Sequence, residues 1–410
     1  MAGVPPGPTF TPGMDFKPRV NGAKKLPLMG ELKAVVTVNL GEGRPLLIID
    51  ARLGEARLRE KIDVKPDTEL TIKPDYICQF YEDRLEVRYG LFVHAFFHHF
   101  GMPKGSIPIA IKFGDLLTPH VPMPPKPYKP GDETPVPSED VEQAKQDLEK
   151  YGYALVKNAL TPEQVVILKR AVLQQAAGEV RVGVATQDGG PNNPNQRLWS
   201  LSNKGDEFLD LLNHSLIDAI VPSLLGEHAI LNDYSANIAR PGNVPTQLHM
   251  DQIAIQPSLR NIACGITILW FLADVTEKNG GTRVFPGSHT GNVAPADLFD
   301  FDGTVAAEGR AGTALVMDSR LWHATGLNTE TSGERPILIT IFVRLFIRRR
   351  ENYFLSLRPE VEAKISNRIK RLLGFYTTGA LGGVEGEIRE GIYVKRVENP
   401  IGPLREAGVA

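Results

Sequence analysis

A proline-rich segment divides this chain into two parts. Prolines occupy eight of the nineteen positions from 119 to 137. Because proline fixes φ and has no amide hydrogen, this segment cannot continue a helix or join the middle of a sheet. It is expected to be a semi-rigid extended linker. With roughly 100–200 residues per domain, 410 residues leave room for a folded part on each side, at 29–118 and 138–410. Residues 1–28 are expected to be a disordered or extended tail.

Composition narrows the class of protein. The 46 basic and 48 acidic residues give a net charge of −2, which provides no general attraction to nucleic acid or to an anionic membrane. No stretch of about 18 apolar residues predicts a membrane span. The N-terminal residues show no signal-peptide pattern. Two distant cysteines, Cys78 and Cys264, fit a reducing compartment, so a cytoplasmic location is expected.

The part before the linker has an α+β pattern. Strands are expected at 31–38, 45–51, 56–62 and 68–72, followed by a helical region from 75 to about 96. The alternating stretch 105–113 is expected to be the last strand. Together these predict an antiparallel sheet with helical segments.

The part after the linker begins with helices and continues with strands. Ser138 is expected to cap a helix over 139–150, and Thr161 to begin a capping box with Gln164 on a helix ending near 177. Another amphipathic helix is expected over 216–225, broken or kinked at Pro222. From 229 onward, short β-like runs alternate with Gly, Pro and Asn turns. This predicts a mainly-β sandwich or barrel with flanking helices.

Three polar side chains in the β-rich part form a metal-ligand set. His249 and Asp251 are two residues apart, so on an extended strand both point to one face. His323 follows 72 residues later. Two imidazoles and one carboxylate are the donors of an Fe(II) facial triad, which leaves positions open for a co-substrate and oxygen. A structural zinc site would use four ligands, usually with thiolates. Taken alone, His-x-Asp occurs by chance and His323 could be a core histidine.

Arg335 adds a second element, 12 residues after His323 at the start of an apolar run. A guanidinium at the edge of an apolar pocket suits bidentate binding of a carboxylate. A 2-oxo acid would chelate iron through its oxo and carboxylate groups and pair its distal carboxylate with arginine.

At these positions the sequence resembles the phytanoyl-CoA dioxygenase family. The resemblance covers roughly 141–348 and lies in HMDQ (249–252), EKNGGTRVFPGSH (277–289), GTALVMDSRLWHATGLNT (312–329), ERP (334–336) and the opening YGYALVKNALTPEQV (151–165). It implies a double-stranded β-helix, a jelly-roll or cupin-like fold, that binds Fe(II) and uses 2-oxoglutarate and O2 as co-substrates.

The resemblance assigns roles to individual residues. His249, Asp251 and His323 would be the catalytic iron ligands, and Arg335 would hold the distal carboxylate of 2-oxoglutarate. Gln247 and Thr282 would hydrogen-bond 2-oxoglutarate, unless they are a rim residue and a plain turn hydroxyl. Asp318 is expected to be a turn acid, with support of the metal ligands as the alternative. Because Asp251 keeps the carboxylate that related halogenases lack, halogenation is not expected.

Substrate-pocket residues are predicted from strand alternation. If Arg335 points inward, the residues two, four, six, eight and ten positions later share its face, unless a bulge reverses the order. On this strand the candidates near the iron are Ile341, Val343 and Leu345. Tyr234 and Trp199 are further candidates from other segments, and each of the five has ordinary core packing as the alternative. Arg344 falls on the opposite face and would pair with a substrate carboxylate only if it turned inward.

Residues 30–117 resemble the sterol-carrier-protein family, an α+β fold with a lipid-binding tunnel. That resemblance lies in segments such as LKAVVTVNLGEGRPLLIIDARLGEARL and KGSIPIAIKFGDLL. It implies substrate delivery, with dimerisation or stability as alternatives. The histidines of FVHAFFHHF (92–100) indicate an interface helix more than a metal site.

The sequence therefore predicts an Fe(II)/2-oxoglutarate-dependent dioxygenase. Its expected partners are a small-molecule substrate and a second copy of the chain in a homodimer. It would oxidise an unactivated C–H bond of a small organic metabolite in secondary metabolism, by hydroxylation, desaturation or ring closure, releasing succinate and CO2. The substrate would be lipophilic (acyl or terpenoid) or derived from an amino acid. Two alternatives stay open, a lipid carrier with an idle oxygenase domain and an interaction module.

Overall fold

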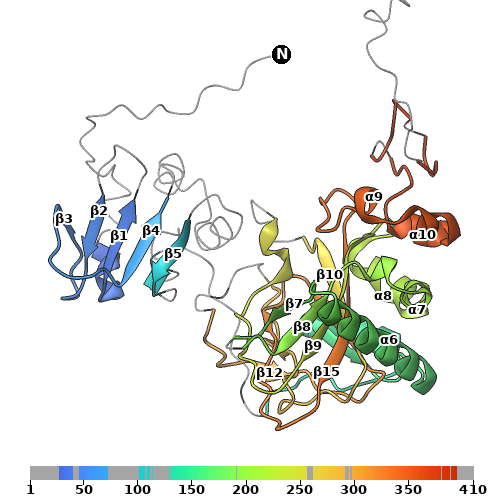
Figure 1. Ribbon diagram of the computed structural model, residues 1–410, viewed down its shortest axis with the longest axis horizontal. Helices are drawn as coiled ribbons and strands as arrows, with labels where there is room; N and C mark the ends of the chain where they lie inside the picture. The colour runs from blue at the N-terminus through green and yellow to red at the C-terminus, as the bar shows by residue number, and fades with distance from the viewer. Residues whose placement is uncertain are drawn as a thin grey trace, which may run out of the picture. The chain divides into compact units, whose positions relative to one another are not determined.

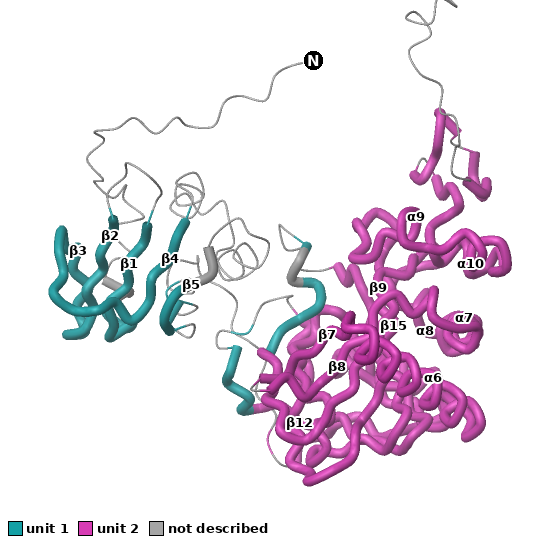
Figure 2. Tube along the Cα trace, in the orientation of Figure 1, with its two compact units in different colours: residues 1–125, 248–260, 291–302 teal, residues 126–247, 261–290, 303–410 magenta. Residues whose placement is uncertain are grey.

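The computed structural model describes residues 27–39, 46–72, 101–106, 109–110, 113, 129, 131–190, 192–255, 262–290, 295, 298–379, 381–387 and 389–394. Contacts divide the chain into two compact units (Figure 2). One comprises 1–125, 248–260 and 291–302, and the other 126–247, 261–290 and 303–410. Most of the predicted tail, the helical region 75–96, the histidines of 92–100 and most of the proline-rich segment lie outside the described residues.

The N-terminal part contains a five-stranded sheet in the order β3-β2-β1-β4-β5. A 3-10 helix, Pro27–Leu32, precedes β1 (Val35–Asn39), β2 (Leu47–Asp50), β3 (Arg57–Arg59), β4 (Thr68–Thr71) and β5 (Gly101–Gly105). The sheet is mixed rather than wholly antiparallel, because β1 and β4 run parallel. The expected four early strands are present, although each is shorter than predicted.

The last strand of this sheet was predicted wrongly. β5 ends at Gly105, where the strand over 105–113 was expected to begin, and Ile109, Ala110 and Phe113 are helical. Ala110 and Phe113 are both buried. Their three-residue spacing places them on one face of a helix, so the apolar alternation in this stretch fits a helical turn as well.

The second part begins with helices whose ends are capped by side chains. Asp140, not Ser138, caps α5 (Val141–Tyr151), and Ser138 instead accepts a hydrogen bond from the Asp140 amide. Thr161 and Gln164 form the predicted capping box of α6 (Pro162–Arg181). The shorter α7 (Asp206–Leu211) and α8 (Ser215–Leu225) follow a 3-10 helix at Leu201–Asn203, and α8 accommodates Pro222 in its last turn.

Two sheets carry the β-rich region. The larger has seven strands in the order β6-β13-β10-β15-β9-β8-β7, all antiparallel to their neighbours. Its strands are β6 (Tyr153–Val156), β7 (Thr186–Asp188), β8 (Asn195–Leu198), β9 (Ile230–Ala239), β10 (Gly265–Phe271), β13 (Ala314–Asp318) and β15 (Arg335–Val343). The smaller joins β12 (Val305–Ala306), β11 (Arg283–Val284) and β14 (His323–Ala324).

The two faces of the larger sheet pack against different partners. On the helix face, Tyr234, Ala236 and Leu338 join a core with residues of α5, α6, α7 and α8. In Figure 1, α6, α7 and α8 lie beside the strands of the larger sheet. On the inner face, Leu269, Leu315 and Ile337 pack with Val284 of the smaller sheet. Residues that alternate along one strand therefore enter different cores, as pleating requires. Two facing antiparallel sheets are consistent with the expected jelly roll.

Beyond β15 the chain forms three short helices, α9 (Tyr353–Ser356), α10 (Pro359–Lys364) and α11 (Asn367–Leu372). Their buried residues, among them Val361 and Ile369, extend the helix-face core. Within the described residues, no helix combines the length and apolar character needed to span a membrane.

Candidate active site

The segment that carries His249 and Asp251 is extended at its start and helical at its end. Met250 has φ −121° and ψ 141°, and a 3-10 helix (Asp251–Ala254) begins at the next residue. A longer strand was expected through this stretch. The alternation nevertheless holds locally, because Leu248 and Met250 are buried while His249 and Asp251 remain partly accessible. His249 and Asp251 therefore face the same way, as predicted.

His323 lies on β14, which pairs with β11 in the smaller sheet. Its Nδ1 lies 3.0 Å from the carbonyl oxygen of Leu321. Since a carbonyl can only accept, Nδ1 carries the proton and the lone pair of the neutral ring is on Nε2. A hydrogen bond of this kind commonly orients a histidine that binds a metal through its other nitrogen.

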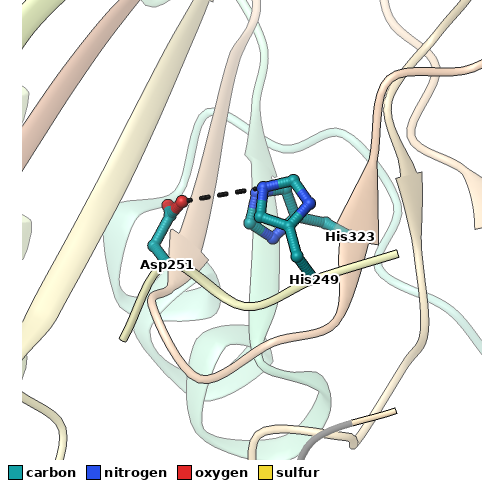
Figure 3. Close-up of side chains that lie close together, drawn as sticks. All are labelled: His249, Asp251 and His323. Atoms are coloured by element: carbon teal, nitrogen blue, oxygen red, sulfur yellow. Dashed lines mark ion pairs between the residues drawn. The ribbon is translucent and has the colours of Figure 1, made fainter. Parts of the chain in front are cut away.

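The three side chains meet in space (Figure 3). One ligand atom from each of His249, Asp251 and His323 lies within 4.8 Å of the other two. The His249 Nε2 and Asp251 Oδ1 atoms are 4.0 Å apart. Metal–ligand bonds of about 2.0–2.2 Å would require the donors to close slightly around an ion. Two imidazoles and one carboxylate suit a divalent transition metal such as iron.

Hydrogen bonds align the two segments that carry these ligands. The Thr246 amide donates to the Thr325 carbonyl, and the Thr325 amide donates to Thr246 Oγ1 at 2.8 Å. The buried Asn243 accepts from the Asn328 amide at 2.6 Å and donates to the Gly326 carbonyl at 3.0 Å. We call Asn243 and Thr246 the loop clip. It was not predicted from the sequence, because neither residue belongs to a recognisable spacing pattern.

The glycine-rich turn packs against the loop that follows His323. A Cβ on Gly326 would lie 2.4 Å from the carbonyl oxygen of Gly281, and Gly280 has φ +83°. Only glycine allows this close approach of two backbones. The turn therefore supports the loop beside His323. This packing explains the presence of glycine within NGGT (279–282).

Arg335 is buried and its guanidinium has no protein partner among the described residues. Its exposed fraction is 1%, and none of these residues accepts a hydrogen bond from Nε, Nη1 or Nη2. Burial lowers the pKa of Arg335 to about 10, with a smaller contribution from nearby Arg197. The pKa still leaves the side chain positively charged at neutral pH. Such a group is costly unless an anion pairs with it.

The other predicted co-substrate residues differ in burial. Gln247 is half-buried in the segment that leads to His249, while Thr282 is buried and its carbonyl accepts a hydrogen bond from the Ala307 amide. Asp318 binds the Arg320 guanidinium at 2.6 and 2.9 Å and accepts from the Arg320 amide. It is therefore the turn acid that was predicted.

The predicted pocket residues of β15 and its end fall into two groups. Ile341 and Val343 are buried but belong to neither core, and Leu345 lies beyond the strand and is half-buried. A register shift lies between Ile341 and Phe342, the irregularity allowed for in the sequence analysis. Arg344 donates to the carbonyls of Leu224, Leu225 and Ala263, so it caps the end of α8.

The two aromatic candidates occupy different places. Tyr234 was predicted to line the pocket, but it is fully buried on the helix face and its hydroxyl donates to the Phe208 carbonyl. Alternation explains the error, because Tyr234 lies between two inward-facing residues. Trp199 is half-buried and stacks under the guanidinium of Arg350, 4.6 Å from the ring centroid.

The inner face of β9 carries three buried polar side chains that were not predicted from the sequence. They are Asp233, Ser235 and Asn237, which we call the β9 strip. They alternate with residues of the helix-face core, so they share the inner face with Ile337. The polar residues at every second position within NDYSANIA (232–239) could have predicted this strip.

This chain is similar to several known proteins. Residues 148–337 match the family model "Phytanoyl-CoA dioxygenase (PhyH)". "Dioxygenase af480" of Aspergillus fumigatus is 29% identical over 254 residues, 61% of this chain and 81% of that protein. "Dioxygenase sphC" of the same species is 26% identical over 261 residues, 56% of this chain and 67% of that protein. The crystal structure of SnoK, titled a non-heme alpha ketoglutarate dependent carbocyclase, has 20% identity and a TM-score of 0.42, covering 52% of this chain and 87% of SnoK.

Proposed function

We propose that this chain, whose residues 148–337 match the phytanoyl-CoA dioxygenase family model, is an Fe(II)- and 2-oxoglutarate-dependent dioxygenase acting on a small organic metabolite. The two facing antiparallel sheets support this proposal, because they are consistent with the double-stranded β-helix expected for such an enzyme. Its reaction releases succinate and CO2 and oxidises an unactivated C–H bond.

The iron would be held by His249, Asp251 and His323. Their nitrogen, nitrogen and oxygen donors suit ferrous iron and leave coordination positions for the co-substrates. Bound iron, with 2-oxoglutarate and O2, supplies the oxidising power for C–H cleavage. The protein orients the ligands: the Leu321 carbonyl fixes the His323 ring, and the loop clip aligns the segments that carry the ligands.

The buried guanidinium of Arg335, which has no partner among the described residues, is the observation that carries the proposal. A carboxylate would satisfy its hydrogen-bond donors and neutralise its charge. The distal carboxylate of 2-oxoglutarate has that chemistry. Gln247 and Thr282 are proposed to hydrogen-bond the same co-substrate, and each is a separate target for mutation.

A lipid carrier with an idle oxygenase domain is the competing function. In an idle domain, a buried charge without a partner only lowers the stability of the fold. In a working site, binding of the anion compensates for the free-energy cost of burying that charge. Arg335 therefore favours the enzyme. The sterol-carrier-like role of residues 29–118, the cytoplasmic location and the homodimer remain part of the proposal, to be tested by lipid binding, localisation and sedimentation.

The reaction itself is the test of function. Purified protein with Fe(II), ascorbate, 2-oxoglutarate and O2 should release succinate above the level of an Asp251→Ala variant. Even without substrate, slow uncoupled turnover of 2-oxoglutarate is expected. Succinate release equal in wild type and variant would contradict the proposal, provided that both proteins are folded by circular dichroism.

A further inference from the structure

The stretch 344–373, which holds α9, α10 and α11, is strongly basic although the whole chain is not. It contains nine arginines and lysines and three acids, a net charge of +6 within a chain of net charge −2. Three of these cations, Arg358, Lys364 and Arg368, pair with carboxylates. The remaining positive charge is therefore concentrated on the other cations of this stretch.

Three of those other cations lie over aromatic rings. The pairs are Arg349 over Phe354 at 5.1 Å, Lys370 over Tyr393 at 4.7 Å and Arg371 over Tyr376 at 4.1 Å from the ring centroid. Within the part of the chain that the structure describes, none of the three cations forms an ion pair with a carboxylate. An aromatic ring attracts a cation without neutralising it, so these charges stay available to an anion.

The rings beneath these cations form one contiguous group. The ring centroids of Phe354 and Phe375 are 4.8 Å apart, and those of Phe375 and Tyr393 are 6.5 Å apart. Tyr376 joins the group at 5.5 Å from Tyr393. The three cations therefore belong to one region of the surface and not to separate places on it.

Large apolar side chains are exposed in the same region. Leu355 is 77% exposed, Phe346 is 59% exposed and Phe354 is 40% exposed. A single exposed apolar residue is ordinary, but apolar side chains grouped with uncompensated cations are typical of an interaction surface. We call Arg349, Phe354, Leu355, Lys370 and Arg371 the basic–aromatic patch.

Acidic side chains of this region have partners of their own. Glu362 accepts a hydrogen bond from the Tyr393 hydroxyl at 2.6 Å, and Glu390 accepts one from the Gly379 amide. Glu387 pairs with Arg389. The cations of the basic–aromatic patch must therefore find their counter-charges outside these contacts.

We propose that the basic–aromatic patch docks this protein on an anionic lipid bilayer. Arg349, Lys370 and Arg371 meet the lipid phosphates, while Leu355 and Phe354 enter the boundary between headgroups and acyl chains. A nucleic acid would match the cations but would leave Leu355 in water, so the bilayer accounts for both features. This inference goes beyond the proposed function and does not depend on it.

The test is co-sedimentation of the full-length protein with lipid vesicles. Vesicles of phosphatidylcholine alone are compared with vesicles that also contain phosphatidylserine. The wild type should bind the anionic vesicles at least about tenfold more tightly, because each lysine or arginine at an anionic surface contributes to binding. Raising the salt concentration should remove most of this preference, since the charges act from an exposed surface.

Variants on the patch assign the binding to its two components. Lys370→Gln/Arg371→Gln should weaken binding to anionic vesicles by about tenfold. Leu355→Ser should weaken it by about fivefold, because a leucine side chain is no longer buried in the bilayer. Circular dichroism checks that each variant is folded, as expected for Leu355→Ser at a largely exposed position.

Matched controls make the same changes elsewhere on the surface. Lys157→Gln/Arg310→Gln removes two charges from side chains that are 50% and 91% exposed. Val182→Ser removes an aliphatic side chain that is 69% exposed. Both should bind anionic vesicles as tightly as the wild type.

Several results would overturn the inference. These are equal binding to neutral and anionic vesicles, binding that the patch variants leave unchanged, and equal losses in the control variants. Tight binding of a single-stranded oligonucleotide without vesicle binding would replace the bilayer by a nucleic acid. Lipid binding through residues 29–118 would persist in the patch variants. Failure of the proposed function would appear separately, as a wild type that forms no visible iron–2-oxoglutarate complex.

Discussion

The Nδ1 atom of His323 lies 3.0 Å from the carbonyl oxygen of Leu321, two residues earlier in the chain. This single contact fixes both the tautomer and the direction of the ring. It leaves Nε2 as the metal donor, in a group whose other members come from a segment more than 70 residues away. A backbone carbonyl next to the smaller sheet therefore orients the His323 ring before any ion binds.

Replacing His323 should abolish tight iron binding. His323→Ala removes one of three protein donors, so Fe(II) affinity should fall by at least about 100-fold while the fold is retained. His228→Ala removes an exposed histidine and is the control. Equilibrium dialysis with iron analysis measures both. Unchanged iron content in His323→Ala would remove this histidine from the site.

Arg335→Met should stabilise the protein without ligand and abolish its stabilisation by 2-oxoglutarate. A pKa lowered from 12.5 to about 10 means that burial of the charged form costs on the order of 3 kcal/mol. Methionine removes this cost with similar apolar volume. The melting temperature should rise by about 2–4 °C for each kcal/mol regained. Added 2-oxoglutarate should then raise it in wild type only.

Arg320→Met is the matched control for that experiment. Arg320 is also largely buried, but it pairs with Asp318, which is 1% exposed. Its loss leaves a buried carboxylate unpaired and should destabilise the protein by about 3–5 kcal/mol. If Arg335→Met were destabilised as strongly as Arg320→Met, the Arg335 guanidinium would have a structural role and not the proposed one.

Asn243→Ala should weaken iron binding although Asn243 is not a ligand. Its side chain joins the Gly326 carbonyl and the Asn328 amide to the segment that leads to His249. Without it the two ligand segments lose part of their alignment, and Fe(II) affinity should fall about tenfold. Dialysis measures the affinity, and circular dichroism checks the fold. An unchanged affinity would limit the loop clip to a stabilising role.

Stability should decrease below pH 6.5 because of His214. Its Nε2 contacts the Ala159 carbonyl and its Nδ1 accepts from the Leu216 amide, capping α8. Burial lowers the pKa of His214 below 6.5. Between the lowered pKa and 6.5, this histidine is therefore protonated in the unfolded chain but not in the folded one. The free energy of unfolding should fall by up to about 1.4 kcal/mol per pH unit for this residue.

His214→Asn tests that origin of the pH dependence. Asparagine can cap the helix but does not titrate, so the melting temperature should change less between pH 7 and 5 than in wild type. Some dependence should persist, because burial also lowers the pKa of His289. An identical pH profile in the variant would exclude His214 as a contributor.

Local rules predicted the parts of the site that depend on short spacing. The two-residue separation of His249 and Asp251 is sufficient to place both on one side, and the Thr161 capping box follows from four residues. The meeting of His323 with the other two depends on the loop clip and the sheet pairing. That contact was predicted only from the resemblance to a family and not from the spacing of the residues.

Errors arose where local patterns allow two structures. The stretch 105–113 has apolar spacing compatible with strand and helix, and tertiary packing selected the helix at Ala110 and Phe113. Ser138 and Asp140 are both good capping residues, so the start of α5 was misplaced by two positions. Tyr234 was predicted to line the pocket, whereas alternation with its neighbours places it on the helix face. The same alternation would have identified the β9 strip.

The most direct test of the account is an anaerobic titration of metal-free protein with Fe(II) and 2-oxoglutarate, followed by visible absorption. The account predicts a charge-transfer band of the iron–2-oxoglutarate chelate in wild type, no band in His249→Ala, and a band in Arg335→Ala only at much higher 2-oxoglutarate concentration. Folded wild-type protein that shows no band would contradict it, and lipid binding by the N-terminal part would then become the leading function.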